Sequence, residues 1–182
     1  VSLDRSGMPS DSSWVGRMAR DLAAFFRIAN LINSTGDVGA MQQQLLALIC
    51  EVIPAEEGAI VFQTTAANEE SSPACIWNRQ ERPGHKMIIR DEIVQQAIWD
   101  RCAIFTGNAP GAGSAQHVLC VPLVGVERTL GVIYLAAATA SPVFGEDHAF
   151  FLSSVSRIVA VTLEHLSKLD SLRAENQRLQ EA

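Results

Sequence analysis

The sequence has few charged residues, and neither sign of charge is gathered into runs. Charged residues make up 19% of the 182 residues, and 20 Asp and Glu outnumber 14 Lys and Arg, which gives a formal net charge of −6. Nucleic-acid-binding surfaces usually need clustered Lys and Arg, so the composition disfavours direct nucleic-acid binding by this chain. Because 48% of the residues are hydrophobic, the chain is too apolar to be disordered. One folded domain with extensions is predicted.

Long hydrophobic runs are missing as well. The two longest, Val118–Val126 and Leu130–Ala138, are far shorter than the about 20 residues that cross a bilayer. Residues 1–13 are polar, are expected to be disordered, and do not have the pattern of a signal peptide. We therefore expect a cytoplasmic protein without a membrane segment. Because the chain starts without Met and stops within a helical pattern, we also expect it to be an excised fragment.

Motifs for metal binding and catalysis are also lacking. The cysteines Cys50, Cys75, Cys102 and Cys120 are far apart in apolar surroundings, which predicts buried, reduced thiols. No C-x-x-C or H-x-x-x-H spacing supports a metal site. His117 and Cys120 are three residues apart on one predicted strand, so their side chains lie on opposite faces and do not form a catalytic pair.

The glycine-rich stretch Thr106–Ala115 could suggest phosphate binding. It lacks the Gly-Lys-Ser/Thr ending of a P-loop and does not join a strand to a helix in the dinucleotide-binding pattern. A mobile loop that covers a pocket is the better interpretation. We therefore predict that the chain is not an enzyme, and we assign it no catalytic residue and no metal ligand.

Helical patterns predominate at both ends of the sequence. From Trp14 to Ile32 apolar residues follow a strict heptad stripe, with Phe26 and Leu31 on a second face, so this helix needs two partners. A second helix is predicted over Val38–Ile53, with Asp37 as its N-cap. Its predicted buried residues are Val38, Met41, Leu45, Leu48, Ile49 and Val52.

Strands and short loops make up the middle of the chain. Strands are predicted over Gly58–Thr65, Ala74–Gln80 and Lys86–Ile89, and a helix over Arg90–Cys102. The runs "HVLCVPLVGV" and "LGVIYLAAA" are separated by three residues, which predicts an antiparallel hairpin covered on both faces. A final helix begins near Glu146 and continues to the end of the chain. The fold class is therefore α+β, with a central antiparallel sheet and flanking helices.

These patterns resemble the GAF domain, a sensor module related to the PAS domain. The resemblance rests on "HVLCVPLVGVERTLGVIYL", on "VFGEDHAFFLSSVSRIVAVTLEHL" that follows it, and on "LLALICEVIPAEEGAIVF" near the start. It implies a GAF domain over residues 14–166, followed by a coiled-coil linker over residues 167–182. The tail "LRAENQRLQ" resembles the linker between GAF and AAA+ ATPase modules in sigma-54-dependent transcriptional activators. That resemblance implies an AAA+ ATPase and a Fis-type DNA-binding domain in the full-length protein.

In GAF domains the ligand lies between the sheet and the excursion that corresponds here to residues 84–114. We expect an unidentified small-molecule ligand there and assign no cofactor. Arg79 and Arg90 could orient an acidic ligand, because guanidinium pairs with carboxylate or phosphate in a bidentate way. The candidate ligand-binding residues are Phe62, Trp77, Arg79, Ile89, Arg90, Phe105, His117 and Leu119. These side chains could equally fill the core and leave no pocket.

The end helices are predicted to form a homodimer. In the tail, Asn176 falls at an a position of the heptad pattern, where a single Asn fixes register and favours two strands. The leucines from Leu163 to Leu172 step by three residues, which predicts a local overwinding near Leu166. The candidate interface residues are Val15, Met18, Leu22, Phe25, Ile32, Leu169, Leu172, Asn176 and Leu179.

The sequence therefore predicts a dimeric sensory domain that relays a signal through its end helices to an ATPase. Two alternatives stay open at this point. One is a ligand-free dimerisation scaffold, and the other is a cysteine-based redox sensor or enzyme. A closed core favours the scaffold, a cavity with converging polar groups favours the sensor, and neighbouring cysteines at a pocket favour redox chemistry.

Overall fold

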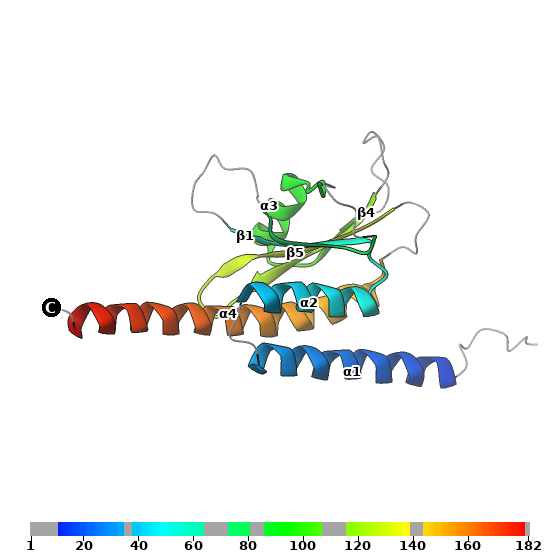
Figure 1. Ribbon diagram of the computed structural model, residues 1–182. Helices are drawn as coiled ribbons and strands as arrows, with labels where there is room; N and C mark the ends of the chain where they lie inside the picture. Colours follow the sequence, from blue (N-terminus) through cyan, green and yellow to red (C-terminus); the bar gives the residue numbers. More distant parts are fainter. Residues whose placement is uncertain are drawn as a thin grey trace, which may run out of the picture.

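A computed structural model describes residues 11–34, 38–63, 73–80, 86–106, 116–138 and 144–180 (Figure 1). The helices are α1 (Asp11–Ser34), α2 (Val38–Val52), α3 (Asp91–Asp100) and α4 (Glu146–Gln180). The strands are β1 (Glu57–Phe62), β2 (Pro73–Asn78), β3 (Ile104–Thr106), β4 (Gln116–Val124) and β5 (Thr129–Ala138). The cover predicted for the glycine-rich loop and the N-cap predicted at Asp37 lie outside the described residues.

The five strands form one sheet in the order β2-β1-β5-β4-β3, and every described pair of neighbours is antiparallel. The hairpin of β4 and β5, predicted from its short turn, forms the middle of the sheet. The predicted α+β class with a central antiparallel sheet and flanking helices is confirmed.

Helices cover both faces of this sheet, as the unbroken apolar runs predict. Alternate residues of β4 point to opposite sides: Leu119 and Leu123 belong to the core under α2 and α4, and Val118 and Cys120 belong to the core under α3. Figure 1 shows α3 on one side of the sheet and the other three helices on the opposite side.

Helix α1 packs on α2 and α4, on the side away from the sheet (Figure 1). It begins at Asp11, three residues before the predicted start at Trp14. Among the α1 side chains that the structure describes, Ala24 and Ile28 are buried, and Leu31 packs beside them. Leu22, from the predicted heptad stripe, is 54% exposed. Leu31, predicted on the second apolar face, thus packs on the domain, whereas Leu22 of the stripe does not.

Two local predictions are corrected. The predicted strand Lys86–Ile89 has no strand pairing, and its residues lead into α3 with Met87 buried beneath that helix. In α2, Val38 is exposed rather than buried. Val38 is the first residue of α2, and the helix begins beyond the edge of the core.

Helix α4 packs on β4 and β5 and then extends beyond the sheet (Figure 1). Its segment Glu146–Lys168 has the length and the mean hydropathy, 1.3, of a membrane span, and half of that window is buried within the domain. Leu152, Val155 and Val159 are among its core residues, so the apolar composition is explained by packing on the sheet. Of the α4 side chains that are described, Glu164 is the last buried one.

Candidate functional site

The carboxylate of Glu164 is buried against the turn between β4 and β5. The backbone N–H of Val126 donates to Glu164 Oε2 at 2.6 Å, and the N–H of Glu127 donates to Oε1 at 3.1 Å. A Cβ at Gly125 would lie 2.6 Å from Glu164 Oε2, so the approach of the carboxylate needs glycine there. The side chain therefore holds the turn against α4.

A second contact joins α4 to the same turn. Lys168 Nζ lies 2.6 Å from Glu127 Oε1, and both side chains are about half exposed. The N–H of Val126, followed by that of Glu127 and the charges of Lys168 and His165, holds the pKa of Glu164 below its usual range. The hydrogen bond and charge of Glu127 raise the pKa of Lys168. Both groups are therefore charged at neutral pH.

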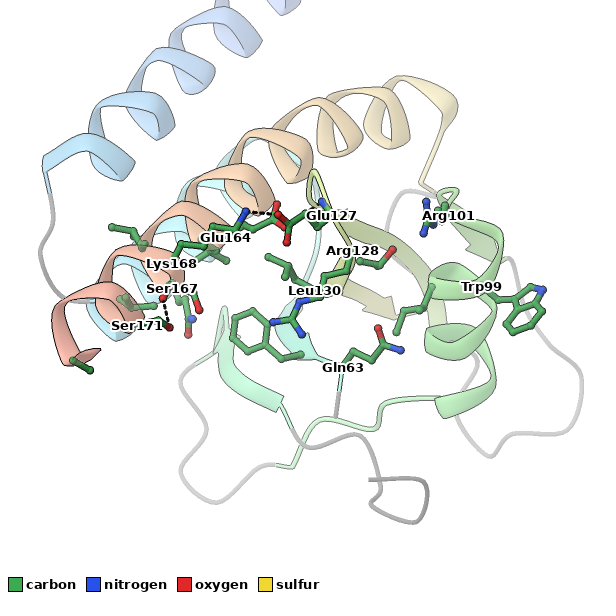
Figure 2. A pocket seen from close by; sticks show the side chains of 18 residues that line it. Gln63, Trp99, Arg101, Glu127, Arg128, Leu130, Glu164, Ser167, Lys168 and Ser171 are labelled. Carbon is green, nitrogen blue, oxygen red and sulfur yellow. Dashed lines mark hydrogen bonds and ion pairs between the residues drawn. The ribbon is translucent and has the colours of Figure 1, made fainter. Parts of the chain in front are cut away.

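A groove of about 1210 Å³ opens beside these contacts (Figure 2). It runs from the start of α2 past the end of β1 and the β4–β5 turn to α4, and its rim reaches the end of α3. It is lined by Val38, Gln42, Phe62, Gln63, Ile98, Trp99, Arg101, Glu127, Arg128, Thr129, Leu130, Leu163, Glu164, Leu166, Ser167, Lys168, Ser171 and Ala174. Figure 2 shows Glu127, Glu164 and Lys168 gathered where α4 passes the turn, whereas Trp99 points away from them.

Three polar side chains of the groove wall are more than nine-tenths buried, namely Glu164 and two others. Gln42 is 6% exposed and Thr129 is 7% exposed. The Thr129 hydroxyl is fully buried and has no hydrogen-bond partner in the part of the chain that the structure describes. Buried polar groups are normally paired, so unpaired ones at a cavity mark a place where a ligand or water is held.

The eight predicted ligand-binding residues do not gather around this groove or around one another. Phe62 alone among them lines the groove. Phe62, Trp77 and Leu119 belong to the core under α2 and α4, whereas Ile89 belongs to the core under α3. The thickness of the sheet separates the two sets. Whether any of the eight binds a ligand stays a prediction.

Both predicted ligand-orienting arginines have structural contacts. Arg79 donates to the carbonyl oxygens of Cys50 at 2.7 Å and Ala55 at 3.1 Å, and its guanidinium lies 5.7 Å from the Trp77 ring centroid. It thereby satisfies carbonyl groups at the end of α2. Arg90 directly precedes α3, and its N–H donates to the hydroxyl of Tyr134 at 3.4 Å.

The two remaining candidates lie at the β3–β4 edge. Phe105 is 48% exposed on β3, paired with Leu119 of β4. His117 is buried on β4, and its Nδ1 has no hydrogen-bond partner among the described residues.

A family model for the GAF domain matches residues 37–165, which is more than half of the chain. The chain belongs to the GAF family. This confirms the resemblance that the sequence motifs indicate. No curated protein matches the sequence significantly.

Solved GAF domains share the fold at low sequence identity. A GAF domain from Pseudomonas syringae pv. tomato superposes with a TM-score of 0.70 at 18% identity and covers 92% of this chain and 99% of its own. The GAF domain of a phosphoenolpyruvate-protein phosphotransferase from Coxiella burnetii gives 0.66 at 13% identity, over 84% of this chain and 98% of its own. GAF domains are sensory or regulatory parts of signalling proteins, and that broad role holds here.

One neighbour of the same fold is an enzyme. The free methionine-R-sulfoxide reductase from Neisseria meningitidis, solved with its substrate, has a TM-score of 0.64 at 17% identity and covers 90% of this GAF chain and 95% of its own. Fold likeness at that identity does not carry the activity over. No group of three metal-ligating side chains gathers in the described ranges.

The cysteines only partly match their prediction. Cys50, Cys75 and Cys120 are buried and free, but Cys102 is exposed. It follows the left-handed Arg101, at φ 52°, that ends α3. The chain therefore leaves the helix toward solvent at this point, which the apolar neighbours of Cys102 did not indicate.

The predicted dimer residues are only partly described. The side chains of Val15, Met18, Phe25, Ile32 and Leu169 lie outside the described part. Leu22, Leu172, Asn176 and Leu179 are exposed in the single chain, so they are free to contact a partner. Leu163 is 8% exposed and Leu172 is 57% exposed. These two leucines thus belong to different faces, and the steps of three between them do not form one continuous stripe.

Sequence reasoning missed the groove because its residues come from distant segments. Glu164 did carry a signal, since an acidic residue stands beside Leu163 on the face that packs on the sheet. Gln42 carried another, as a polar residue next to Met41 and close to Leu45 on the buried face of α2. No local pattern indicated Arg128 or Lys168, because exposed turn and helix residues are usually only solvated.

Proposed function

We propose that this GAF domain is the signal-sensing regulatory domain of a sigma-54-dependent transcriptional activator. In this proposal the domain is a cytoplasmic homodimer that binds a small molecule. Binding alters the packing of α4, and α4 passes the change to a downstream AAA+ ATPase that acts with a Fis-type DNA-binding domain.

One observation carries the proposal: α4 contacts the candidate site and then extends beyond the domain. Glu164 and Lys168 contact the β4–β5 turn. The same helix continues to Gln180 with its side chains exposed from Ser167 onward, wherever they are described. A change in the conformation of the turn therefore acts directly on α4, the helix that extends away from the sheet.

The exposed apolar side chains of the end helices support dimerisation. Leu172 and Leu179 are exposed on α4 and are spaced by one heptad. Ile158, two heptads before Leu172, is partly exposed on the same helix, and Phe26 is 60% exposed on α1. A second copy could cover these residues in a parallel helical interface. The coiled coil itself stays a proposal.

The assignment to sigma-54-dependent activators is supported by the resemblance of "LRAENQRLQ" to their linkers. It is tested by placing this chain in front of the AAA+ module of such an activator, in the natural linker register, and measuring ATPase activity. We expect activity that depends on the domain and on the register set by Asn176. An Asn176→Leu chimera should lose regulation, with Gln177→Leu as the control. Equal activity with and without the domain would remove the assignment.

A ligand-free dimerisation scaffold is the second candidate. It is favoured by the packing between α3 and the sheet, where the side chains of Val94, Ala97 and Tyr134 are buried together. The groove, with the unpaired hydroxyl of Thr129 in its wall, favours the sensor instead. Native mass spectrometry of the chain purified from cells separates the two, because the sensor predicts an added mass in at least part of the sample and the scaffold predicts none.

A further inference from the structure

The β4–β5 turn presents an arginine that has no counter-charge. The Arg128 carbonyl oxygen accepts from the N–H of Gly125 at 2.9 Å, but its guanidinium lines the groove and makes no hydrogen bond or ion pair with the described part of the chain. The nearby acids are already engaged, since Glu164 accepts two turn N–H groups and Glu127 pairs with Lys168. A guanidinium presents five donors in a planar fork that matches carboxylate and phosphate oxygens.

The wall next to Arg128 is mixed in the way ligand sites usually are. Phe62 and Leu130 supply apolar surface, and the buried Gln42 and Thr129 supply polar groups, of which the Thr129 hydroxyl is unpaired among the described residues. Small-molecule sites are mainly apolar with a few polar groups that fix orientation. Figure 2 shows Arg128 and Leu130 next to Glu127 at the β4–β5 turn.

We propose that this groove binds a small acidic molecule, a carboxylate or phosphate ester with an apolar body. Arg128 contacts the acidic group, Phe62 and Leu130 contact the apolar body, and Gln42 and Thr129 donate hydrogen bonds. The inference rests on the proposed function, because it names the class of signal that the sensory domain detects.

The position of Lys168 gives such a ligand a direct effect on α4. Lys168 Nζ donates to Glu127 Oε1 at 2.6 Å and so joins α4 to the turn. An acidic group held by Arg128 competes with Glu127 for this ammonium group. Binding therefore exchanges a contact between α4 and the turn for a contact between α4 and the ligand, which alters how the helix is held at the point where it leaves the sheet.

The test is an NMR titration of backbone amides in the isolated chain. The probes are phenyl phosphate and benzoate, with benzyl alcohol as the neutral analogue of similar size. We expect saturable shift changes for one or both acids at residues 126–128 and at Lys168, and much weaker binding of benzyl alcohol. Binding by only one acid identifies the acidic group as phosphate or carboxylate.

Three variants locate the site. Arg128→Ala should weaken binding roughly tenfold, as expected for the loss of a charge-assisted contact, whereas Arg178→Ala, an equal charge change outside the groove, should not. Thr129→Val keeps the shape and should weaken binding. Glu127→Gln should strengthen binding severalfold, because Lys168 loses its competing carboxylate. A merely structural role of the turn does not produce such a gain.

The results separate the site from the relay. The inferred site is overturned if neither acid gives saturable shifts, if Arg128→Ala and Arg178→Ala bind alike, or if benzyl alcohol binds as well as the acids. Saturable binding that leaves the amides of α4 beyond Ser171 unchanged keeps the site but overturns the proposed relay along α4.

Discussion

Single residues at the β4–β5 turn fix how α4 meets the sheet. The Glu164 carboxylate accepts hydrogen bonds from two N–H groups of the turn, and Gly125 leaves room for it. Both bonds are partly buried, and an N–H group that loses its acceptor there is costly, so we expect loss of this carboxylate to destabilise the turn.

Replacing Glu164 tests this contact through pH. The pKa of Glu164 is lowered in the folded state, so its contribution to stability is fully present above the unfolded glutamate pKa of about 4.3 and is lost as the pH falls through the lower folded value. We expect Glu164→Gln to lower the melting temperature by several degrees at neutral pH and by less in acid. Glu175→Gln, an exposed change on α4, is the control. An equal loss at both pH values would contradict the charged contact.

Replacing two glycines by alanine should change stability in opposite directions, through backbone crowding at Gly131 and through helix propensity at Gly16. A Cβ at Gly131 would lie 2.0 Å from the Val61 carbonyl oxygen, where β1 and β5 pair, whereas a Cβ at Gly16 meets nothing within 4 Å. We expect Gly131→Ala to destabilise the fold by roughly 3 kcal/mol or more. Gly16→Ala should stabilise α1 by up to about 1 kcal/mol. Urea unfolding of both variants measures these changes in stability. A small loss of stability in Gly131→Ala would contradict the close approach of β1 to β5 at this glycine.

Cysteine reactivity tests the burial of the thiols. Burial raises the pKa of Cys50, partly offset by the charge of Arg79, and of Cys120, each to about 12, and thiolates are the reactive form. We expect one fast-reacting thiol per native chain, at the exposed Cys102, and its loss in Cys102→Ser. All four should react after unfolding. Two or more fast thiols in the native chain would reopen the redox alternative.

At the scale of elements, α4 has two functions on two faces. The face with Leu152, Val155 and Leu163 completes the core, and the face with Leu172 and Leu179 is left exposed. One continuous helix thus belongs both to the domain and to the proposed interface.

The two faces predict opposite effects of leucine truncation. We expect Leu163→Ala to lower the unfolding free energy by about 2–5 kcal/mol, because it opens a cavity in the core, and to leave the dimer contacts in place. Leu172→Ala should leave the domain almost as stable and weaken dimerisation. Urea unfolding and analytical ultracentrifugation of both variants measure the two properties. Similar effects of both changes on either property would contradict the division.

At the scale of the whole molecule, the sequence predicted the fold better than the site. Unbroken apolar runs such as "HVLCVPLVGV" determine a hairpin buried on both faces wherever its neighbours lie. The face of α1 that packs was less predictable, because the heptad stripe with Leu22 and the pair Ala24 and Ile28 both provide apolar surface. The groove depends on contacts between α2, the β4–β5 turn and α4, and such long-range contacts leave little trace in local spacing.

The central claim is that α4 and α1 join two copies of this domain into the unit that transmits a signal. Native mass spectrometry of the 19.7 kDa chain at micromolar concentration tests it most directly. We predict a mass of twice the chain, a shift to the monomer in the Leu172→Glu/Leu179→Glu variant, and no shift in Ile88→Glu, an exposed control away from the end helices. A monomeric parent chain at that concentration would contradict the account.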